Sequence, residues 1–343
     1  MSPGGSKFKV FLLGKVFGGR RLLVKINEVQ VLQGSRGEIS PFIFWQERIG
    51  HQRSFLWQGR QCRYSFWRSP HADLQNVNTP LVLIHGFGAS IEHWREFIPL
   101  VAGDRPVYSI DLLGFGGSEK AHLDFGVPLW VGQLNYFLET IVSEPALIMG
   151  NSIGSLVAAV VAHKYPDKAA AIALLSVPDV AQRQEMIPAP LRPMVGKIEQ
   201  ATMRPWLIRR LFDVLRRRGV LKNWLKLAYP SLEALQEELI DIIEAPTADF
   251  GAVEAFVALS RRVSRPEFCP PMKQVLPQIA CPILMLWGEK DRFVPVAIAP
   301  ALASTNPQIR LQILPNLGHC PHDEAPELVY QLFTQWLGEI DLL

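Results

Sequence analysis

A hydrophobic run that ends in Gly-Asn-Ser-Ile-Gly constrains the fold of this chain more than any other feature. Residues Ala146–Met149 have the composition of a buried strand, and the Gly-x-Ser-x-Gly pattern of Gly150–Gly154 follows at once. Ser155–His163 is then rich in alanine, valine and leucine, as a buried helix would be. A strand that turns sharply into a helix strains its central residue, so small residues must flank that residue. The pattern therefore predicts a strand, a tight turn and a helix that present the Ser152 hydroxyl above a sheet.

Short hydrophobic runs alternate with stretches of helical period along most of the chain. The runs expected to form strands are Leu81–Ile84, Val107–Ile110, Ala146–Met149, Ala171–Leu175, Ile283–Trp287 and Leu311–Leu314. The stretches expected to form helices are Ile91–Val101, Leu129–Val142, Ser155–His163 and Pro326–Leu337. An aromatic-rich hairpin, Phe55–Trp67 with its turn at Gly59, precedes them. The alternation predicts an α/β protein whose mainly parallel sheet is covered by helices on both faces, with its site at the carboxyl ends of the strands.

The alternation stops between Val180 and about Arg265, where no strand pattern appears. We expect an inserted helical cap there, so that residues 1–50 form a basic extension, 51–179 and 266–343 the core, and 180–265 the cap. The cap has a basic half and an acidic half. Basic residues outnumber acidic ones by 11 to 3 over residues 180–226, whereas residues 227–258 hold 7 acidic residues and no basic one.

One predicted cap helix is both basic and amphipathic. Its apolar face consists of Ile208, Leu211, Phe212 and Leu215, and its basic residues are Arg209, Arg210, Arg216, Arg217 and Arg218. Such a helix suits a membrane surface, but its apolar stripe could equally pack on the core or line a pocket. Both interpretations remain open from the sequence.

Composition excludes several classes of function. Lysine and arginine total 35 against 32 acidic residues, and a net charge of +3 gives no global attraction to nucleic acid. The four cysteines, Cys62, Cys269, Cys281 and Cys320, have neither the paired spacing of a zinc site nor the density of a disulfide framework. We therefore expect no cofactor, no metal ion and a reducing compartment.

The N-terminal segment is the other basic region of the chain. Residues 1–27 carry six lysines and arginines and no acidic residue, which suits either a solvated tail or contact with an anionic membrane. No apolar run reaches the roughly 18 residues that span a bilayer, and no signal-peptide pattern opens the chain. We expect a protein that is not secreted and is either cytoplasmic or peripheral on a membrane.

The chain supplies the two groups that would activate the hydroxyl of Ser152. Asp291 and His319 follow the last two predicted strands, just as Ser152 follows an earlier one. In this order they predict a catalytic triad, in which His319 takes the serine proton and Asp291 orients the imidazole. Glu289 could replace Asp291 as the orienting acid. His322, which lies beside His319, is expected to cap the last helix or to lie at the surface.

Two backbone amides are expected to stabilise the oxyanion that develops on an attacked carbonyl. One belongs to Ile153, the residue after the serine, and the other to Phe87 in the loop that follows Leu81–Ile84. The ring of Phe87 would also form a wall of the pocket. We expect His85 to make structural hydrogen bonds and Asp111 to stabilise the glycine-rich loop that follows it.

These motifs resemble those of the α/β-hydrolase superfamily from Phe55 to the C-terminus. The finer pattern resembles the cyanobacterial and plastid pheophytinase and chlorophyll dephytylase group in Leu113–Lys120, Gly150–Ser155, Ile187–Pro193, Trp287–Pro295 and Gly318–Glu324. The resemblance implies a serine esterase that cleaves the phytyl ester of chlorophyll or pheophytin, with Ser152, Asp291 and His319 in the triad positions. It also implies that any membrane contact is peripheral, on an internal membrane of the thylakoid type.

The cap is expected to bind the apolar part of the ester through Trp206, Phe212 and Trp224. Each methylene removed from water contributes about 0.8 kcal/mol, so a long tail could dominate the choice of substrate. Two alternatives fit the same residues. Carbon–carbon hydrolases of dienoate ring-fission products share the Asn-Ser-x-Gly turn, and a non-catalytic lipid or pigment carrier could use the same scaffold.

Overall fold

Eight strands form one sheet in the order β1-β2-β4-β3-β5-β6-β7-β8. The strands are β1 (His51–Trp57), β2 (Arg60–Trp67), β3 (Leu81–Ile84), β4 (Val107–Ile110), β5 (Ala146–Asn151), β6 (Ala169–Leu175), β7 (Ile283–Gly288) and β8 (Ile309–Leu314). Strands β3 to β8 are parallel, and the hairpin of β1 and β2 adds two antiparallel strands at one edge. The predicted α/β class with a mainly parallel sheet is confirmed.

This computed structural model describes residues 45–68, 78–179, 203–231, 235–263 and 265–343, which all belong to one compact unit. The predictions for residues 1–27 and 187–193 therefore lie outside the described residues. The described α-helices are α1 (Trp45–Arg48), α2 (Ile98–Val101), α3 (Val127–Phe137), α4 (Ile153–Lys164), α7 (Pro205–Leu215), α8 (Arg218–Ala228), α9 (Glu237–Glu244), α10 (Ala252–Arg262), α11 (Met272–Val275), α12 (Ala299–Ala303), α13 (Pro321–Glu324) and α14 (Pro326–Glu339). None of these is long and apolar enough to cross a bilayer.

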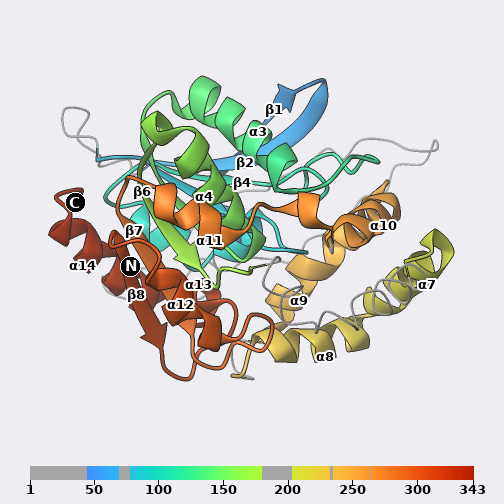
Figure 1. The fold of residues 1–343 in the computed structure, drawn as a ribbon. Helices are drawn as coiled ribbons and strands as arrows, with labels where there is room; N and C mark the ends of the chain where they lie inside the picture. Colours follow the sequence, from blue (N-terminus) through green and yellow to red (C-terminus); the bar gives the residue numbers. More distant parts are fainter. Residues whose placement is uncertain (1–44, 69–77, 180–202, 232–234, 264) are drawn as a thin grey trace, which may run out of the picture. The chain divides into compact units, whose positions relative to one another are not determined.

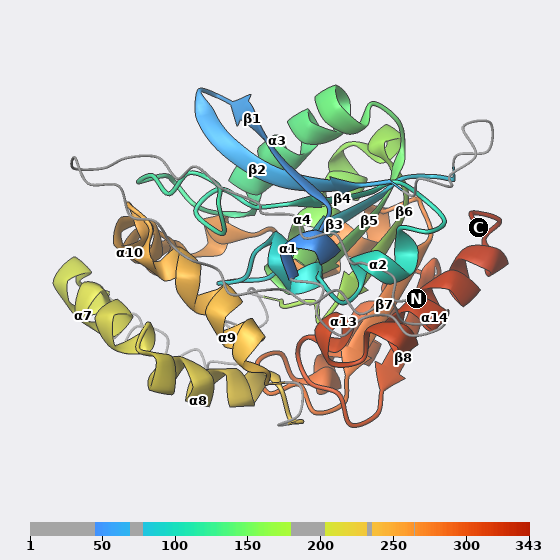
Figure 2. The same cartoon turned by 180° about the vertical axis from the view of Figure 1, so that it is seen from behind.

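Helices cover both faces of the sheet, as Figures 1 and 2 show from opposite sides. Side chains alternate along each strand, so β3 sends Val82 and Ile84 into a core shared with α3 and α4. Its other two residues, Leu81 and Leu83, enter a second core shared with α2 and α14. All four side chains are fully buried, which accounts for the unbroken hydrophobic run that this strand shows in the sequence.

The helix expected at Ile91–Val101 is divided in two. A 3-10 helix covers Ile91–Trp94, and α2 begins only at Ile98. Pro99 has no amide hydrogen, so it cannot donate the helical hydrogen bond to the carbonyl of Arg95 that would join the two parts. The proline therefore explains why the helical period of this stretch does not give one continuous helix.

Helices α7 to α10 lie between β6 and β7 along the chain, and the described residues of this stretch contain no strand. In both views α9 and α10 lie nearer the sheet than α7 and α8 do (Figures 1 and 2). The four helices are thus placed beyond the loops at the carboxyl ends of the parallel strands, where the site is expected.

Candidate active site

Ser152 lies where β5 ends and α4 begins. Its backbone has φ 54° and ψ −117°, in a region that favours glycine. A Cβ atom at Gly150 would collide with the backbone of Gly154, and one at Gly154 would collide with the carbonyl of Ile84. The start of α4 therefore lies too close to both β5 and β3 for a side chain at either glycine, and the turn holds Ser152 at the carboxyl edge of the sheet.

His319 and Asp291 form a buried pair beside this turn. The Nδ1 atom of His319 lies 2.8 Å from Oδ2 of Asp291. Because a carboxylate only accepts hydrogen bonds, Nδ1 carries the proton and Nε2 is left as an acceptor. The other carboxylate oxygen of Asp291 accepts the amides of Phe293 and Val294, each at 2.9 Å. The loop after β7 thus fixes the carboxylate that orients the imidazole.

Ser152 and His319 line the same cavity. The hydrogen bonds of the described residues include none between these two side chains. In proteins without bound substrate, the contact between a catalytic serine and its base is often long. A separate bond joins their loops, because Nδ2 of Asn151 donates to the carbonyl of His319 at 3.0 Å.

The residues that compete with the triad are placed elsewhere. Glu289 accepts the amide of Asn316 at 3.1 Å and makes no hydrogen bond to His319 in the described part of the chain. The expectation that His322 caps a helix or lies at the surface is wrong, because its side chain is fully buried against Trp94, with ring centroids 4.0 Å apart. The short helix α13 packs on the 3-10 helix Ile91–Trp94 and so carries His322 into the interior.

The amides of Phe87 and Ile153 are both available to a ligand. Neither donates a hydrogen bond within the described residues, whereas the neighbouring amide of Ser152 donates to the carbonyl of Leu175. Phe87 also lines the cavity with its ring, while the side chain of Ile153 is buried outside the lining. Two free amides beside a serine at a helix N-terminus could bind a developing oxyanion.

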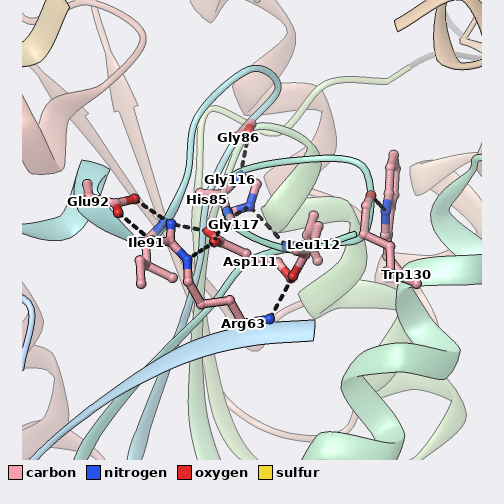
Figure 3. Close-up of polar contacts among 12 residues, drawn as sticks. Arg63, His85, Gly86, Ile91, Glu92, Asp111, Leu112, Gly116, Gly117 and Trp130 are labelled. Atoms are coloured by element: carbon pink, nitrogen blue, oxygen red, sulfur yellow. Dashed lines mark hydrogen bonds and ion pairs between the residues drawn. The ribbon is translucent and has the colours of Figure 1, made fainter. Parts of the chain in front are cut away.

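Asp111 holds together the loops that follow β3 and β4 (Figure 3). Its carboxylate accepts the amides of Ile91 at 2.8 Å and Gly117 at 2.7 Å, and it also pairs with Arg63. The terminal nitrogens of Arg63 donate to Glu92 at 2.7 and 2.8 Å. Asp111 therefore serves the glycine-rich loop, as the sequence predicts, and does not line the cavity.

His85 is part of the same cluster in Figure 3. Its Nδ1 donates to the carbonyl of Gly86 at 2.7 Å, and its Nε2 accepts the amide of Leu112 at 3.1 Å. Burial lowers the pKa of this imidazole, which favours the neutral form that both bonds require. His85 thus fixes the backbone of the loop that carries Phe87.

A cavity of about 370 Å³ lies against Ser152 and His319. Two rows of rings form much of its wall. The first row runs from Phe115 through Phe87 and Phe256 to Phe212, with successive centroids 5.7, 6.3 and 4.9 Å apart. The second row runs from His319 through Phe293 to Trp224, at 5.3 and 4.8 Å. Each row connects the site to a cap helix, the first to α7 and the second to α8.

The lysine and arginine side chains in this lining are Lys120 and Arg216, and each forms an ion pair with an aspartate. Lys120 donates to the carbonyl of Gly116 and, at 2.7 Å, to Asp249. Arg216 lies 3.3 Å from Asp213. Most of the other residues that line the cavity are aromatic or aliphatic, so its wall is largely apolar.

Two of the three predicted pocket residues, Phe212 and Trp224, line the cavity. Trp206 does not, and 61% of its surface is exposed. The two residues of α7 are six positions apart, so Trp206 points about 120° away from Phe212 at 100° per residue. The expectation for Trp206 is thus corrected to a place on the outside of the cap.

A buried polar network connects the cap to the histidine loop, and the sequence did not reveal it. The hydroxyl of Tyr229 donates to Asp323 at 2.7 Å and lies 2.6 Å from Nε2 of His93. Arg95 donates to Asp323 at 2.8 Å and to Glu238 at 3.1 Å. Burial raises the pKa of Tyr229 well above its ordinary value and lowers the pKa of His93 to about 4, so both groups are neutral.

The backbone adds a direct connection between the cap and the site. The amide of His319 donates to the carbonyl of Ala228, the last residue of α8, at 2.9 Å. Beside it, Glu324 accepts the amide of Gly318 at 2.9 Å, and burial raises the pKa of this carboxyl to about 7. The position of His319 therefore depends on the cap as well as on the core.

The described residues contain no cluster of histidine, cysteine, aspartate and glutamate that could hold a metal ion. All four cysteines are free thiols. Burial raises the pKa of Cys62 and Cys269 to about 12 and that of Cys281 to about 11, so these thiols are poor nucleophiles.

Comparisons with known proteins found one family model and several relatives that this chain resembles. A model described as the alpha/beta hydrolase fold matches residues 79–326. The uncharacterized hydrolase YugF of Bacillus subtilis is 27% identical over 295 residues, which cover 85% of this chain and 99% of that protein. The chloroplastic pheophytinase of Arabidopsis thaliana is 22% identical over 316 residues, or 79% of this chain and 63% of that protein.

Among solved structures, a meta-cleavage product hydrolase from Pseudomonas fluorescens IP01 matches with a TM-score of 0.65 at 17% identity. The match covers 86% of this chain and 99% of that chain. At this identity the likeness concerns the fold alone. The segment matched by the fold model contains Ser152, Asp291 and His319.

Proposed function

Because this chain belongs to the alpha/beta hydrolase family, we propose that it is a serine hydrolase that cleaves esters of long apolar substrates. One observation carries the proposal: the His319–Asp291 pair and the strained Ser152 turn face one largely apolar cavity. A serine in this position needs only the general base beside it to become a nucleophile.

The proposed reaction follows from the positions of these groups. Nε2 of His319 takes the proton of the Ser152 hydroxyl as Oγ attacks the ester carbonyl carbon. The amides of Phe87 and Ile153 bind the oxyanion, and Asp291 stabilises the charged imidazole. The carbon–oxygen bond to the alcohol then breaks, and the alcohol leaves with the proton from His319. Water attacks the acyl-enzyme in the same way, which releases the acid and restores the serine.

The cavity supports an apolar substrate. Its wall consists mainly of aromatic and aliphatic side chains, and each buried methylene of a substrate contributes about 0.8 kcal/mol. Within this class we propose the phytyl ester of chlorophyll or pheophytin as the first substrate to test. The support for it is the sequence motifs and the similarity to a pheophytinase.

The other functions considered from the sequence have less support. A dienoate substrate carries a carboxylate that requires a free cation, whereas Lys120 and Arg216 in the cavity wall are already paired. A carrier protein that only binds its ligand does not require a strained serine, nor an imidazole held by a buried carboxylate. Ser152, His319 and Asp291 supply these groups at one cavity, which favours catalysis.

The test is an incubation of the full chain and its Ser152→Ala variant with an extract of pigments and lipids, followed by mass analysis of the products. The proposal expects an acid and an apolar alcohol to appear with the wild-type chain only. Release of phytol would identify the pigment ester. Turnover of short water-soluble esters without release of phytol would contradict the pigment assignment, and identical products from both chains would contradict the serine hydrolase itself.

A further inference from the structure

Helices α7 and α8 carry large apolar side chains that are partly or mostly exposed to solvent. Trp206, Leu211 and Val214 on α7 are 61%, 50% and 40% exposed. On α8, Trp224 and Leu227 are 36% and 41% exposed. We call these five side chains the α7–α8 outer face. In Figures 1 and 2 both helices lie at the edge of the cap that is farthest from the sheet.

The outer face follows from the helical period of α7. Trp206, Arg210 and Val214 recur every four residues and so share one side of the helix, with Leu211 in the adjoining row. The opposite side is occupied, because Phe212 packs on α10 through Phe256. The exposed row is therefore a second apolar surface and not an extension of the core.

Acidic residues of α9 form ion pairs with basic residues of α8. Arg218 donates to three carboxylates of α9, those of Glu237, Asp241 and Glu244, at 2.6–2.7 Å. Lys222 also donates to Glu237, at 2.7 Å. Trp224 and Leu227 lie on other sides of the helix from Arg218, so these carboxylates do not border the outer face.

The charges beside the outer face that form no ion pair are positive. Arg204, Arg210 and Arg217 form no ion pair within the described residues. The neighbouring acid, Asp213, lies 3.3 Å from Arg216, which compensates its negative charge. Exposed apolar side chains beside unpaired arginines match the interface of a bilayer that carries anionic headgroups.

The outer face is also continuous with the lining of the cavity. Trp224 belongs to both surfaces, since it is partly exposed and also lines the cavity. Leu215 and Arg216, where α7 meets α8, line the cavity as well. The two rows of rings described above end on these helices, at Phe212 and Trp224. An apolar molecule that leaves a bilayer at this face would meet apolar surface all the way to the site.

We propose that the α7–α8 outer face docks this protein on the surface of an anionic phospholipid bilayer, with the entrance of its cavity toward the lipid. The apolar side chains enter the interface between headgroups and acyl chains, and the arginines contact the headgroups. Docking does not require Ser152 to act as a nucleophile, so the proposal stands apart from the proposed reaction.

Cosedimentation of the full chain with vesicles tests this proposal. The vesicles are phosphatidylcholine alone and phosphatidylcholine mixed with phosphatidylglycerol. We expect binding to the anionic vesicles and at least a roughly tenfold loss of affinity in two double variants, Leu211→Ser/Val214→Ser and Arg210→Glu/Arg217→Glu. The matched control is Leu56→Ser, an equally drastic change at a 65% exposed leucine on β1, which is expected to bind as the wild type does.

Ser152→Ala is expected to bind like the wild type, so a failure of docking is distinguishable from a failure of the proposed function. Unfolding midpoints confirm that each variant is folded. Absence of wild-type binding to anionic vesicles would overturn the proposal. Undiminished binding by both double variants would also overturn it, because the membrane contact would then lie elsewhere in the chain. A dimer in analytical ultracentrifugation that Leu211→Ser/Val214→Ser dissociates, with vesicle binding unchanged, would identify a self-association surface instead.

Discussion

Nδ1 of His319 lies 2.8 Å from Oδ2 of Asp291, and this contact sets the direction of the imidazole. The carboxylate is itself held by two backbone amides of the loop after β7, so it cannot turn away without breaking three hydrogen bonds. With Nδ1 committed to Asp291, the atom left to act as a base is Nε2.

Removal of the charge at Asp291 is expected to disable the base while leaving the shape of the site intact. An Asp291→Asn side chain donates where the carboxylate accepts, which favours the wrong tautomer of His319. We expect kcat to fall by about 10³- to 10⁴-fold on an apolar ester, measured by steady-state kinetics. The matched control is Glu289→Gln, since Glu289 bonds to Asn316 and not to the imidazole. Equal losses in the two variants would contradict the assignment of Asp291.

The buried network beneath the cap is expected to stabilise the fold through the hydroxyl of Tyr229. Tyr229→Phe leaves Asp323 and His93 each without one hydrogen-bond partner in a buried site. We expect the free energy of unfolding in urea to fall by about 1–3 kcal/mol. Tyr136→Phe is the control, because that exposed tyrosine stacks on Phe55 and its hydroxyl has no partner in the described chain. Equal effects of the two substitutions would show that the network contributes nothing.

The core of the fold could be predicted from the sequence, as could the pairing of Asp291 with His319 beside the cavity that Ser152 lines, because both depend on local patterns. A hydrophobic run marks each strand, and the residues at strand ends meet at one edge of a parallel sheet. The positions of Ser152, Asp291 and His319 after three such strands therefore predict that they lie near one another. The two glycines of the turn are also part of the local pattern, since a side chain at Gly150 would collide with the start of α4 and one at Gly154 with the end of β3.

The parts that the sequence did not predict depend on contacts between distant segments. Asp323 and Arg95 are 228 residues apart in the sequence, and no local pattern around either residue predicts that they pair. The neighbours of His322 suggest the start of a helix and so predict a place at the surface, but the packing of α13 on Trp94 buries it. The residue type of Trp206 favours the pocket, but the orientation of α7 places it outside.

Acid is expected to destabilise the protein through three buried histidines, His85, His93 and His322. Burial lowers the pKa of each, to about 4 for His93, whereas the unfolded value is 6.5. The unfolded chain therefore binds more protons below pH 6.5, and the free energy of unfolding falls as the pH is lowered toward 4. For each proton that the unfolded chain binds in excess of the folded chain, the free energy of unfolding falls by about 1.4 kcal/mol per pH unit.

Glu324 acts in the opposite direction. Burial raises its pKa from 4.5 to about 7, so its contribution to stability is present below pH 4.5 and is lost as the pH rises through 7. Three histidines outweigh one glutamate, and urea unfolding at pH 7 and pH 5 is expected to show lower stability at pH 5. A free energy of unfolding that is unchanged or higher at pH 5 would contradict the neutral state of the histidines.

The length of the substrate is expected to be sensed by Trp224, which lines the cavity and contacts Phe293 beside His319. Trp224→Ala is expected to lower kcat/KM about tenfold for a long-chain ester and to leave an acetate ester nearly unchanged, because only the long chain reaches the indole. Trp206→Ala, measured without membranes, is the matched control in the same cap. A uniform loss along the series of chain lengths, or equal effects of the two substitutions, would count against this role.

Covalent labelling of the folded chain by a fluorophosphonate measures whether Ser152 is an activated nucleophile, because the reagent reacts with a serine that a neighbouring base activates. We expect one adduct, located on the peptide that contains Ser152 and absent from both the Ser152→Ala variant and the urea-unfolded chain. An unlabelled folded protein, or an adduct that persists in Ser152→Ala, would contradict it.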